Sequence, residues 1–170
     1  MKATKTIGIL SIIAGLVMII AGAITYGTVS SQLKAENITV PKDSEFMGGA
    51  FAGKPVTGPL SAYAQADIIN HHALAGTDGK TYAQLGALAS AAREEAKAAE
   101  DAGDATLAEQ KTAEAEAFTA QRTTVMNASF LRASLFSSVI AFGVAALVMG
   151  LGLIIGLIGW ALTTIRHAAE

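Results

Sequence analysis

Two long apolar segments, one near each end of the chain, constrain the fold more than any other feature. The first runs from Ile7 to Val29 and the second from Leu135 to Ile165, and neither contains Asp, Glu, Lys, Arg or His. A helix rises about 1.5 Å per residue and the hydrocarbon core of a bilayer is about 30 Å thick, so about 20 apolar residues can cross it. Both segments exceed that length. The sequence therefore predicts an all-α protein with two transmembrane helices.

The two segments divide the chain into five parts. Basic residues flank the spans, with Lys2 and Lys5 before the first and Arg166 after the second. The positive-inside rule then places both termini in the cytoplasm and the middle outside the plasma membrane. The expected parts are a cytoplasmic N-terminus (1–6), transmembrane helix 1 (7–29), an extracytoplasmic region (30–134), transmembrane helix 2 (135–165) and a cytoplasmic C-terminus (166–170).

A cleaved signal peptide is the alternative for residues 1–23. Two lysines form a basic start, and Ala21-Gly22-Ala23 resembles a cleavage site. The apolar segment is longer than the roughly 7–15 residues of a signal peptide, and it continues past Ala23 to Val29. This length favours an uncleaved anchor.

Glycines recur at helical spacing within both apolar segments. A face bare of side chains lets another helix approach closely, and such small-residue patterns are typical of helix contacts in membranes. Glycine is also simply common in membrane helices, which is the alternative interpretation. The predicted helix-packing residues are Gly8, Gly15, Gly22, Gly152, Gly156 and Gly159.

The region between the spans begins with an irregular arm over residues 30–57, which holds Pro41, Pro55 and several glycines. Large apolar side chains lie along and just after it, where no local core is expected. Exposed apolar groups of this kind often mark a contact surface. We therefore expect 44–59 to dock on a partner and to be mobile without it. The predicted docking residues are Phe46, Met47, Phe51 and Leu60.

Three helices are expected after the arm. Pro59 opens the first and Gly76 follows its end, the usual positions for these two residues. Thr81 and Gln84 form a capping box that begins the second, and Thr106 is expected to cap the third. Residues 84–122 are rich in Ala, Glu and Lys, which predicts an antiparallel helical hairpin with a weakly specified alanine seam.

Catalytic and metal-binding patterns were sought without success. The chain has no cysteine, no phosphate-binding glycine loop and no nucleophile motif. Asp67 precedes His71 by four residues, which predicts a surface pair on one helix face, and His72 beside it points about 100° away.

No ionisable group lies in a span, where transport of protons or ions would need one. We expect no enzyme activity, no cofactor, no metal and no small-molecule substrate. A net charge of −2 is too small to indicate nucleic acid.

Two stretches carry a resemblance to a known family. Residues 50–85 (AFAGKPVTGPLSAYAQADIINHHALAGTDGKTYAQL) and 125–152 (VMNASFLRASLFSSVIAFGVAALVMGLG) resemble small actinobacterial membrane proteins often labelled aromatic ring-opening dioxygenase. One of them is an association factor of the cytochrome bcc–aa3 respiratory supercomplex. The matching stretches cover roughly 65 of the 170 residues and contain no catalytic motif.

The resemblance implies a non-catalytic accessory subunit whose partners are membrane lipids and the cytochrome bcc or aa3 subunits. A dioxygenase would need two histidines and a carboxylate at one open iron site, and His167 is predicted to lie across the membrane from His71 and His72. The alternative function is a stand-alone membrane-organising protein that self-associates through its glycine faces.

Overall fold

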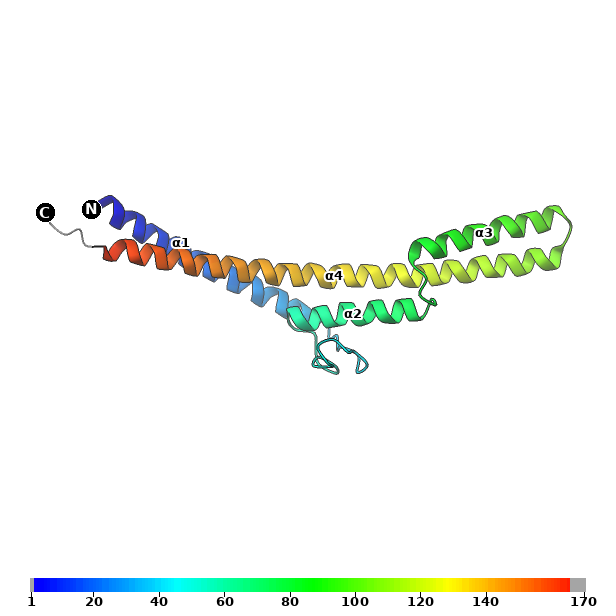
Figure 1. Ribbon diagram of the computed structural model, residues 1–170, viewed down its shortest axis with the longest axis horizontal. Coiled ribbons are helices and arrows are strands. Elements are labelled where there is room, and N and C mark those ends of the chain that lie inside the picture. The colour runs from blue at the N-terminus through cyan, green and yellow to red at the C-terminus, as the bar shows by residue number, and fades with distance from the viewer. Residues whose placement is uncertain (1, 166–170) are drawn as a thin grey trace. The chain divides into compact units, whose positions relative to one another are not determined.

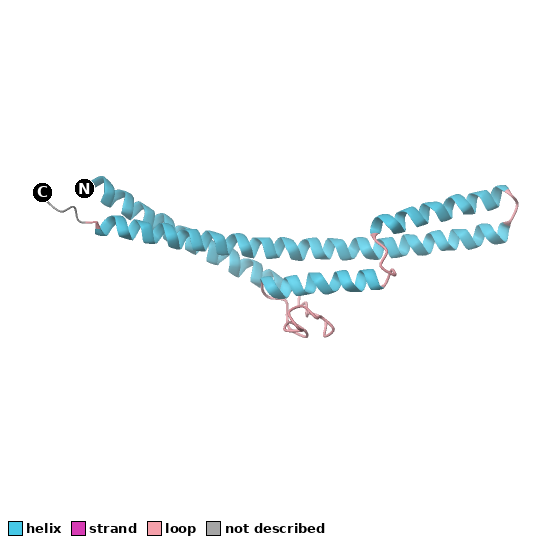
Figure 2. Cartoon of the chain, viewed as in Figure 1, coloured by secondary structure: helices cyan, strands magenta, loops and turns pink. Residues whose placement is uncertain are grey.

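The computed structural model describes residues 2–165, and about four-fifths of them are helical, the rest forming mainly the loops that Figure 2 draws in pink. The predicted all-α fold with two long apolar helices is confirmed. Residues 2–165 contain no β-strand. Thr39 and Pro55 form a single isolated antiparallel β-bridge. Arg166 and His167 lie outside the described residues. The helices are α1 (Lys2–Ala35), α2 (Pro59–Ala75), α3 (Tyr82–Asp101) and α4 (Ala105–Thr164) (Figure 1).

The chain forms two compact units, and α2 and α4 each contribute to both. Within residues 2–165, the first unit contains 2–40, 53–63 and 136–165, which are α1, the start of α2 and the end of α4. The second contains Pro41–Ala52 and Ala64–Leu135. Both apolar segments belong almost wholly to the first unit, and the predicted hairpin belongs to the second.

Helices α1 and α4 extend further than the sequence predicted. α1 continues six residues past Val29 and ends at Ala35, because good helix formers follow and Leu33 is buried. Asn37, with φ of 53°, then takes the left-handed conformation that ends the helix. α4 continues without a break from the predicted hairpin into the second apolar segment, through Thr123 and Thr124. Both hydroxyls donate to carbonyls four residues back, at 3.0 and 3.2 Å.

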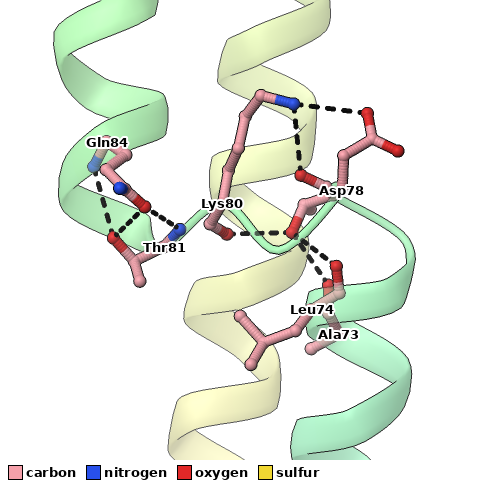
Figure 3. A network of polar contacts seen from close by, with 7 residues as sticks. Ala73, Leu74, Asp78, Lys80, Thr81 and Gln84 are labelled. Carbon is pink, nitrogen blue, oxygen red and sulfur yellow. Dashed lines mark hydrogen bonds and ion pairs between the residues drawn. The ribbon is translucent and has the colours of Figure 1, made fainter.

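Local signals set the helix starts. The predicted capping box of α3 is confirmed, since the Thr81 backbone N–H donates to the Gln84 Oε1 at 2.9 Å (Figure 3). The predicted cap at Thr106 is wrong. Asp104 caps α4 instead, with its Oδ1 accepting from the Leu107 N–H at 3.0 Å. Gly103, with φ of 77°, reverses the chain one residue earlier, so the helix starts sooner than the Thr106 pattern suggested.

A buried threonine fixes the turn between α2 and α3. Thr77 is 1% exposed, and its Oγ1 lies 2.8 Å from the carbonyl oxygen of Lys80 and 3.1 Å from that of Ala73. Figure 3 shows Lys80 over this turn, with its ammonium 3.2 Å from Asp78. Asp78 and Gly79 both have positive φ, at 51° and 76°. The Thr77 hydroxyl therefore links the last turn of α2 to Lys80, the residue just before the N-cap of α3.

The predicted antiparallel hairpin is present in α3 and the first part of α4. Its seam is alanine-rich, as expected, and polar groups tie its edges. Arg93 donates to Thr119 at 2.8 Å, and the Arg122 guanidinium lies 4.1 Å from the centre of the Tyr82 ring. The buried residues of the seam are Leu85, Ala89, Ala92, Ala96, Ala99, Ala108 and Ala115.

Candidate functional site: a helix pair closed by glycines

The first unit is built on close contact between α1 and the end of α4, which run side by side in Figure 1. A Cβ placed on Gly8 would lie 2.7 Å from the carbonyl oxygen of Gly159. A Cβ on Gly152 would lie 2.6 Å from the carbonyl oxygen of Gly15. Real side chains do not tolerate such contacts, so the two backbones are this close only because both partners are glycine.

The contacts have a constant antiparallel register. Gly8 meets Gly159, Gly15 meets Gly152, and a Cβ on Gly22 would lie 2.8 Å from the carbonyl oxygen of Ala145. In each pair the residue numbers add to 167. The rings of Tyr26 and Phe142, whose centres are 4.6 Å apart, continue the pairing by one more turn. The α1 residue at each of these three backbone contacts is therefore a glycine, and successive glycines are seven residues apart.

This register shows which part of α4 lies level with the apolar run of α1. Residues 7–29 face 138–160, a length of about 34 Å. The longer apolar segment of α4 therefore extends past the apolar run of α1 at both ends, by 135–137 and by 161–165, where the polar ends of α1 lie beside it. Trp160 lies at one end of the paired length, and Phe136 lies just beyond the other. Aromatic side chains at the two ends are typical of membrane–water interfaces.

Gly156 differs from the other predicted packing glycines. A Cβ on Gly156 would meet nothing within 4 Å, although a Cβ on Gly15 would lie 2.8 Å from the Gly156 nitrogen. Gly156 thus lies beside the contact and opens a groove of about 280 Å³. The groove is lined by Ile12, Gly15, Leu16, Ile19, Gly152, Leu153, Gly156, Leu157 and Trp160.

The outside of the pair is apolar along both helices. A water-soluble helix pair would bury such residues or replace them with charged ones, whereas a bilayer solvates them. Exposed large apolar side chains include Leu10, Ile13, Leu16, Val17, Ile20, Ile24, Ile140, Val144, Leu147, Leu153, Ile154 and Ile158.

The arm contains a small core that sequence reasoning missed. Val40 and Val56 are fully buried, and the Val40 N–H donates to the carbonyl of Lys54 at 2.9 Å. The Val56 N–H donates to the carbonyl of Ile38 at the same distance. The expectation that no local core exists near the arm was therefore wrong. Alternating apolar residues at 38, 40 and 56 were the available signal, but prolines on both sides obscured it.

The four predicted docking residues fall into two groups. Phe46 and Phe51 are half-buried, with ring centres 6.0 Å apart, so each partly covers the other. Met47 is 62% exposed and has φ of 51° at the tip of the same loop. Leu60 belongs to the other unit, in the first turn of α2, and is 51% exposed.

The histidines do not form the pair expected from the sequence. The Nε2 of His72, not of His71, lies 2.7 Å from a carboxylate, and that carboxylate is Asp43 rather than Asp67. The hydrogen bond from His72 lowers the pKa of Asp43 below its ordinary value. Asp43 is 29 residues away in the sequence, so helical spacing could not reveal it. A pocket of about 310 Å³ beside this pair is lined by Asp43, Glu45, Asp67, Ile68 and His71.

Packing contacts and surface polar pairs are the features that stand out in the described part of the chain. Within residues 2–165, no group of three or more His, Asp or Glu side chains is placed to hold a metal ion. Comparison of the chain with protein-family models, with curated proteins and with solved structures finds no match. The helix pair and the exposed side chains around it are therefore the features from which a function must be argued.

Proposed function

We propose that this protein is a non-catalytic accessory membrane subunit that associates with the actinobacterial cytochrome bcc–aa3 respiratory supercomplex and supports its assembly or stability. Both termini lie in the cytoplasm, and residues 30–134 lie outside the plasma membrane. The family resemblance of 50–85 and 125–152 supplies the identity of the partner. It carries no residue-level detail of the contact.

The observation that carries the proposal is the closed helix pair with its apolar exterior. The glycine contacts occupy the inner faces of α1 and α4, while the outer faces present large apolar side chains. Such a hairpin is a membrane anchor that can pack laterally against lipids or other transmembrane helices. It offers no ionisable group in either apolar segment for a transport step of its own.

A contact outside the membrane would use the loop at 41–52. Met47 is exposed at the tip of this loop, and the rings of Phe46 and Phe51 pack against each other within it. An exposed methionine adapts to irregular partner surfaces, because its side chain is unbranched and polarizable. Replacing Met47 with Ser should therefore weaken association while leaving the helix pair intact.

Copurification tests the proposal. The chain, tagged after its last residue, is expressed in an actinobacterium and extracted in a mild detergent. Cytochrome bcc and aa3 subunits should copurify in a fixed ratio, and Met47→Ser should reduce that ratio relative to Lys42→Ser, an exposed change in the same loop. Recovery of the tagged chain without either cytochrome complex would refute the proposal.

A topology reporter tests the orientation separately. A reporter active only outside the membrane should be active when inserted at Gly103 and silent when fused after Glu170. The opposite pattern would reverse the proposed orientation. A mature chain that begins after Ala23 would establish the signal-peptide alternative instead.

Self-association through the glycine faces is the second candidate function. The glycine contacts described above join two helices of the same chain, so a partner copy could use those faces only after the pair opened. This geometry favours the accessory-subunit proposal. Isolation of a defined homo-oligomer with no other protein bound would favour self-association.

A further inference from the structure

Two exposed side chains occupy one face of the first turn of α2. Leu60 and Tyr63 are three residues apart, which places them on the same side of the helix, and they are 51% and 40% exposed. Leu60 presents a large apolar side chain at the surface, and exposed apolar groups of this kind often mark a contact surface.

Contacts within the first unit show which residues of α1 and α4 lie beside the first turn of α2. The Tyr63 ring packs edge-on against Phe136 of α4, with centres 5.7 Å apart. The Ser30 hydroxyl of α1 donates to the carbonyl of Thr57 at 2.7 Å. Ser61 in turn accepts from the N–H groups of Thr57 and Gly58, which ties the first turn of α2 to the same point.

That level is the boundary between the apolar segments and the first charged residues. The apolar run of α1 ends at Val29 and that of α4 begins at Leu135, so Ser30 and Phe136 lie within two residues of these ends. The nearest charges beyond them are Lys34 and Arg132. Residues 57–63 are therefore held where hydrocarbon gives way to headgroups.

We propose that the first turn of α2 is an interfacial lipid anchor, with Leu60 in the acyl-chain region and Tyr63 at the headgroup level of the outer leaflet. Leu60 is 51% exposed at the level where the apolar exterior of the helix pair ends, and the proposed bilayer covers that exterior. Tyrosine is enriched at this depth because its ring is apolar and its hydroxyl is polar. The contacts of the turn with Ser30 and Phe136, at the ends of the two apolar segments, favour the lipid surface rather than a protein partner as the occupant.

The anchor has a structural consequence for the arm. The chain leaves α1 after Ala35 and returns to this turn at Thr57, which Ser30 of α1 contacts, so the turn holds the returning end of the arm at the membrane surface. This inference rests on the proposed membrane insertion but not on the supercomplex as partner.

Tryptophan fluorescence tests the proposal directly, because Trp160 is the chain's single tryptophan. In a Trp160→Phe background, Leu60→Trp and Tyr63→Trp each report on the turn, and Leu88→Trp reports on an exposed site of α3 as the matched control. The full-length variants are reconstituted in vesicles of phosphatidylcholine and phosphatidylglycerol. Part of the lipid carries bromine high on the acyl chain, where it quenches nearby tryptophan.

The expected result is that brominated lipid removes roughly half of the fluorescence of the tryptophans at 60 and 63. Acrylamide, a quencher dissolved in water, should affect them little. The control at position 88 should show the reverse pattern. Quenching of 60 and 63 by acrylamide but not by lipid would overturn the proposal.

Two further results would overturn it in distinguishable ways. Shielding of position 60 only after purified supercomplex is added would assign the turn to a protein partner instead. Absence of lipid quenching at Trp160 of the unaltered chain would show that the helix pair itself is not inserted. That second result would refute the membrane part of the proposed function as well.

Discussion

Alanine substitutions at Gly152 and Gly156 should have very unequal consequences for the helix pair, although the two residues are one turn apart on α4. A Cβ at Gly152 would lie 2.6 Å from the carbonyl oxygen of Gly15 and 2.9 Å from the Cβ of Met18. Ordinary van der Waals contact needs about 3.5 Å, so α1 and α4 must move apart by roughly 0.5–1 Å. A Cβ at Gly156 would enter the open groove and meet nothing within 4 Å.

The expected magnitudes follow from this difference. Overpacking costs about 1–3 kcal/mol, and 1.4 kcal/mol is a factor of ten, so Gly152→Ala should weaken pairing about tenfold. Gly156→Ala should change the free energy of pairing by less than about 0.5 kcal/mol, as for a substitution without contacts. Both variants gain the same helix propensity, and both states are helical in a membrane, so that term cancels.

The assay is energy transfer between dyes at Ala3→Cys and Thr164→Cys, which lie at the same end of the pair. The chain has no other cysteine, so labelling is specific. Transfer should be lost at a lower concentration of denaturing detergent in Gly152→Ala than in Gly156→Ala or the unaltered chain. Equal midpoints for the two alanine variants would refute the proposed register.

Three further predictions concern the region between the apolar segments. Asp104→Ala should destabilise the start of α4 by about 0.5–2 kcal/mol, and Thr106→Ala should have little effect, as measured by hydrogen exchange of the first turn. Thr77→Val should cost about 1–3 kcal/mol in thermal unfolding, because it keeps the shape but leaves a buried carbonyl without its hydroxyl donor. The protection of the loop at 41–52 against hydrogen exchange, relative to an unfolded chain at the same pH, should fall as pH falls through the lowered pKa of Asp43, since a depressed carboxyl pKa stabilises the folded state above the ordinary value of 3.8. Asp43→Asn should abolish that pH dependence, because asparagine has no carboxyl group that could lose its charge in this range.

Much of the fold was predictable because its signals are local. The uncharged runs, Pro59, Gly76 and the Thr81 capping box each act within a few residues, and each marks a helix where the structure has one. The cap of α4 was assigned to Thr106 instead of Asp104, because both residues suit the position and only the turn at Gly103 decides between them.

Long-range contacts could not be predicted in the same way. The glycine spacing indicated a packing face on each helix, but the register that joins Gly15 to Gly152 depends on both backbones at once. The pairing of Asp43 with His72 and the burial of Val40 against the end of the arm likewise join residues far apart in the sequence. Partner contacts stay predictions, because a single chain contains only half of each interface.

The closed antiparallel helix pair is the central claim, and cysteine cross-linking tests it most directly. Tyr26→Cys with Phe142→Cys places thiols where the two rings now lie 4.6 Å apart. The control, Tyr26→Cys with Leu153→Cys, moves one thiol eleven residues along α4, about 16 Å away. A short bifunctional thiol reagent is applied in native membranes, and the chain is then cut at a protease site inserted at Gly103. The account predicts that the two fragments stay joined in the first variant and separate in the control, with no cross-linked dimer. Cross-linked dimers in place of joined fragments, or equal linking in both variants, would contradict it.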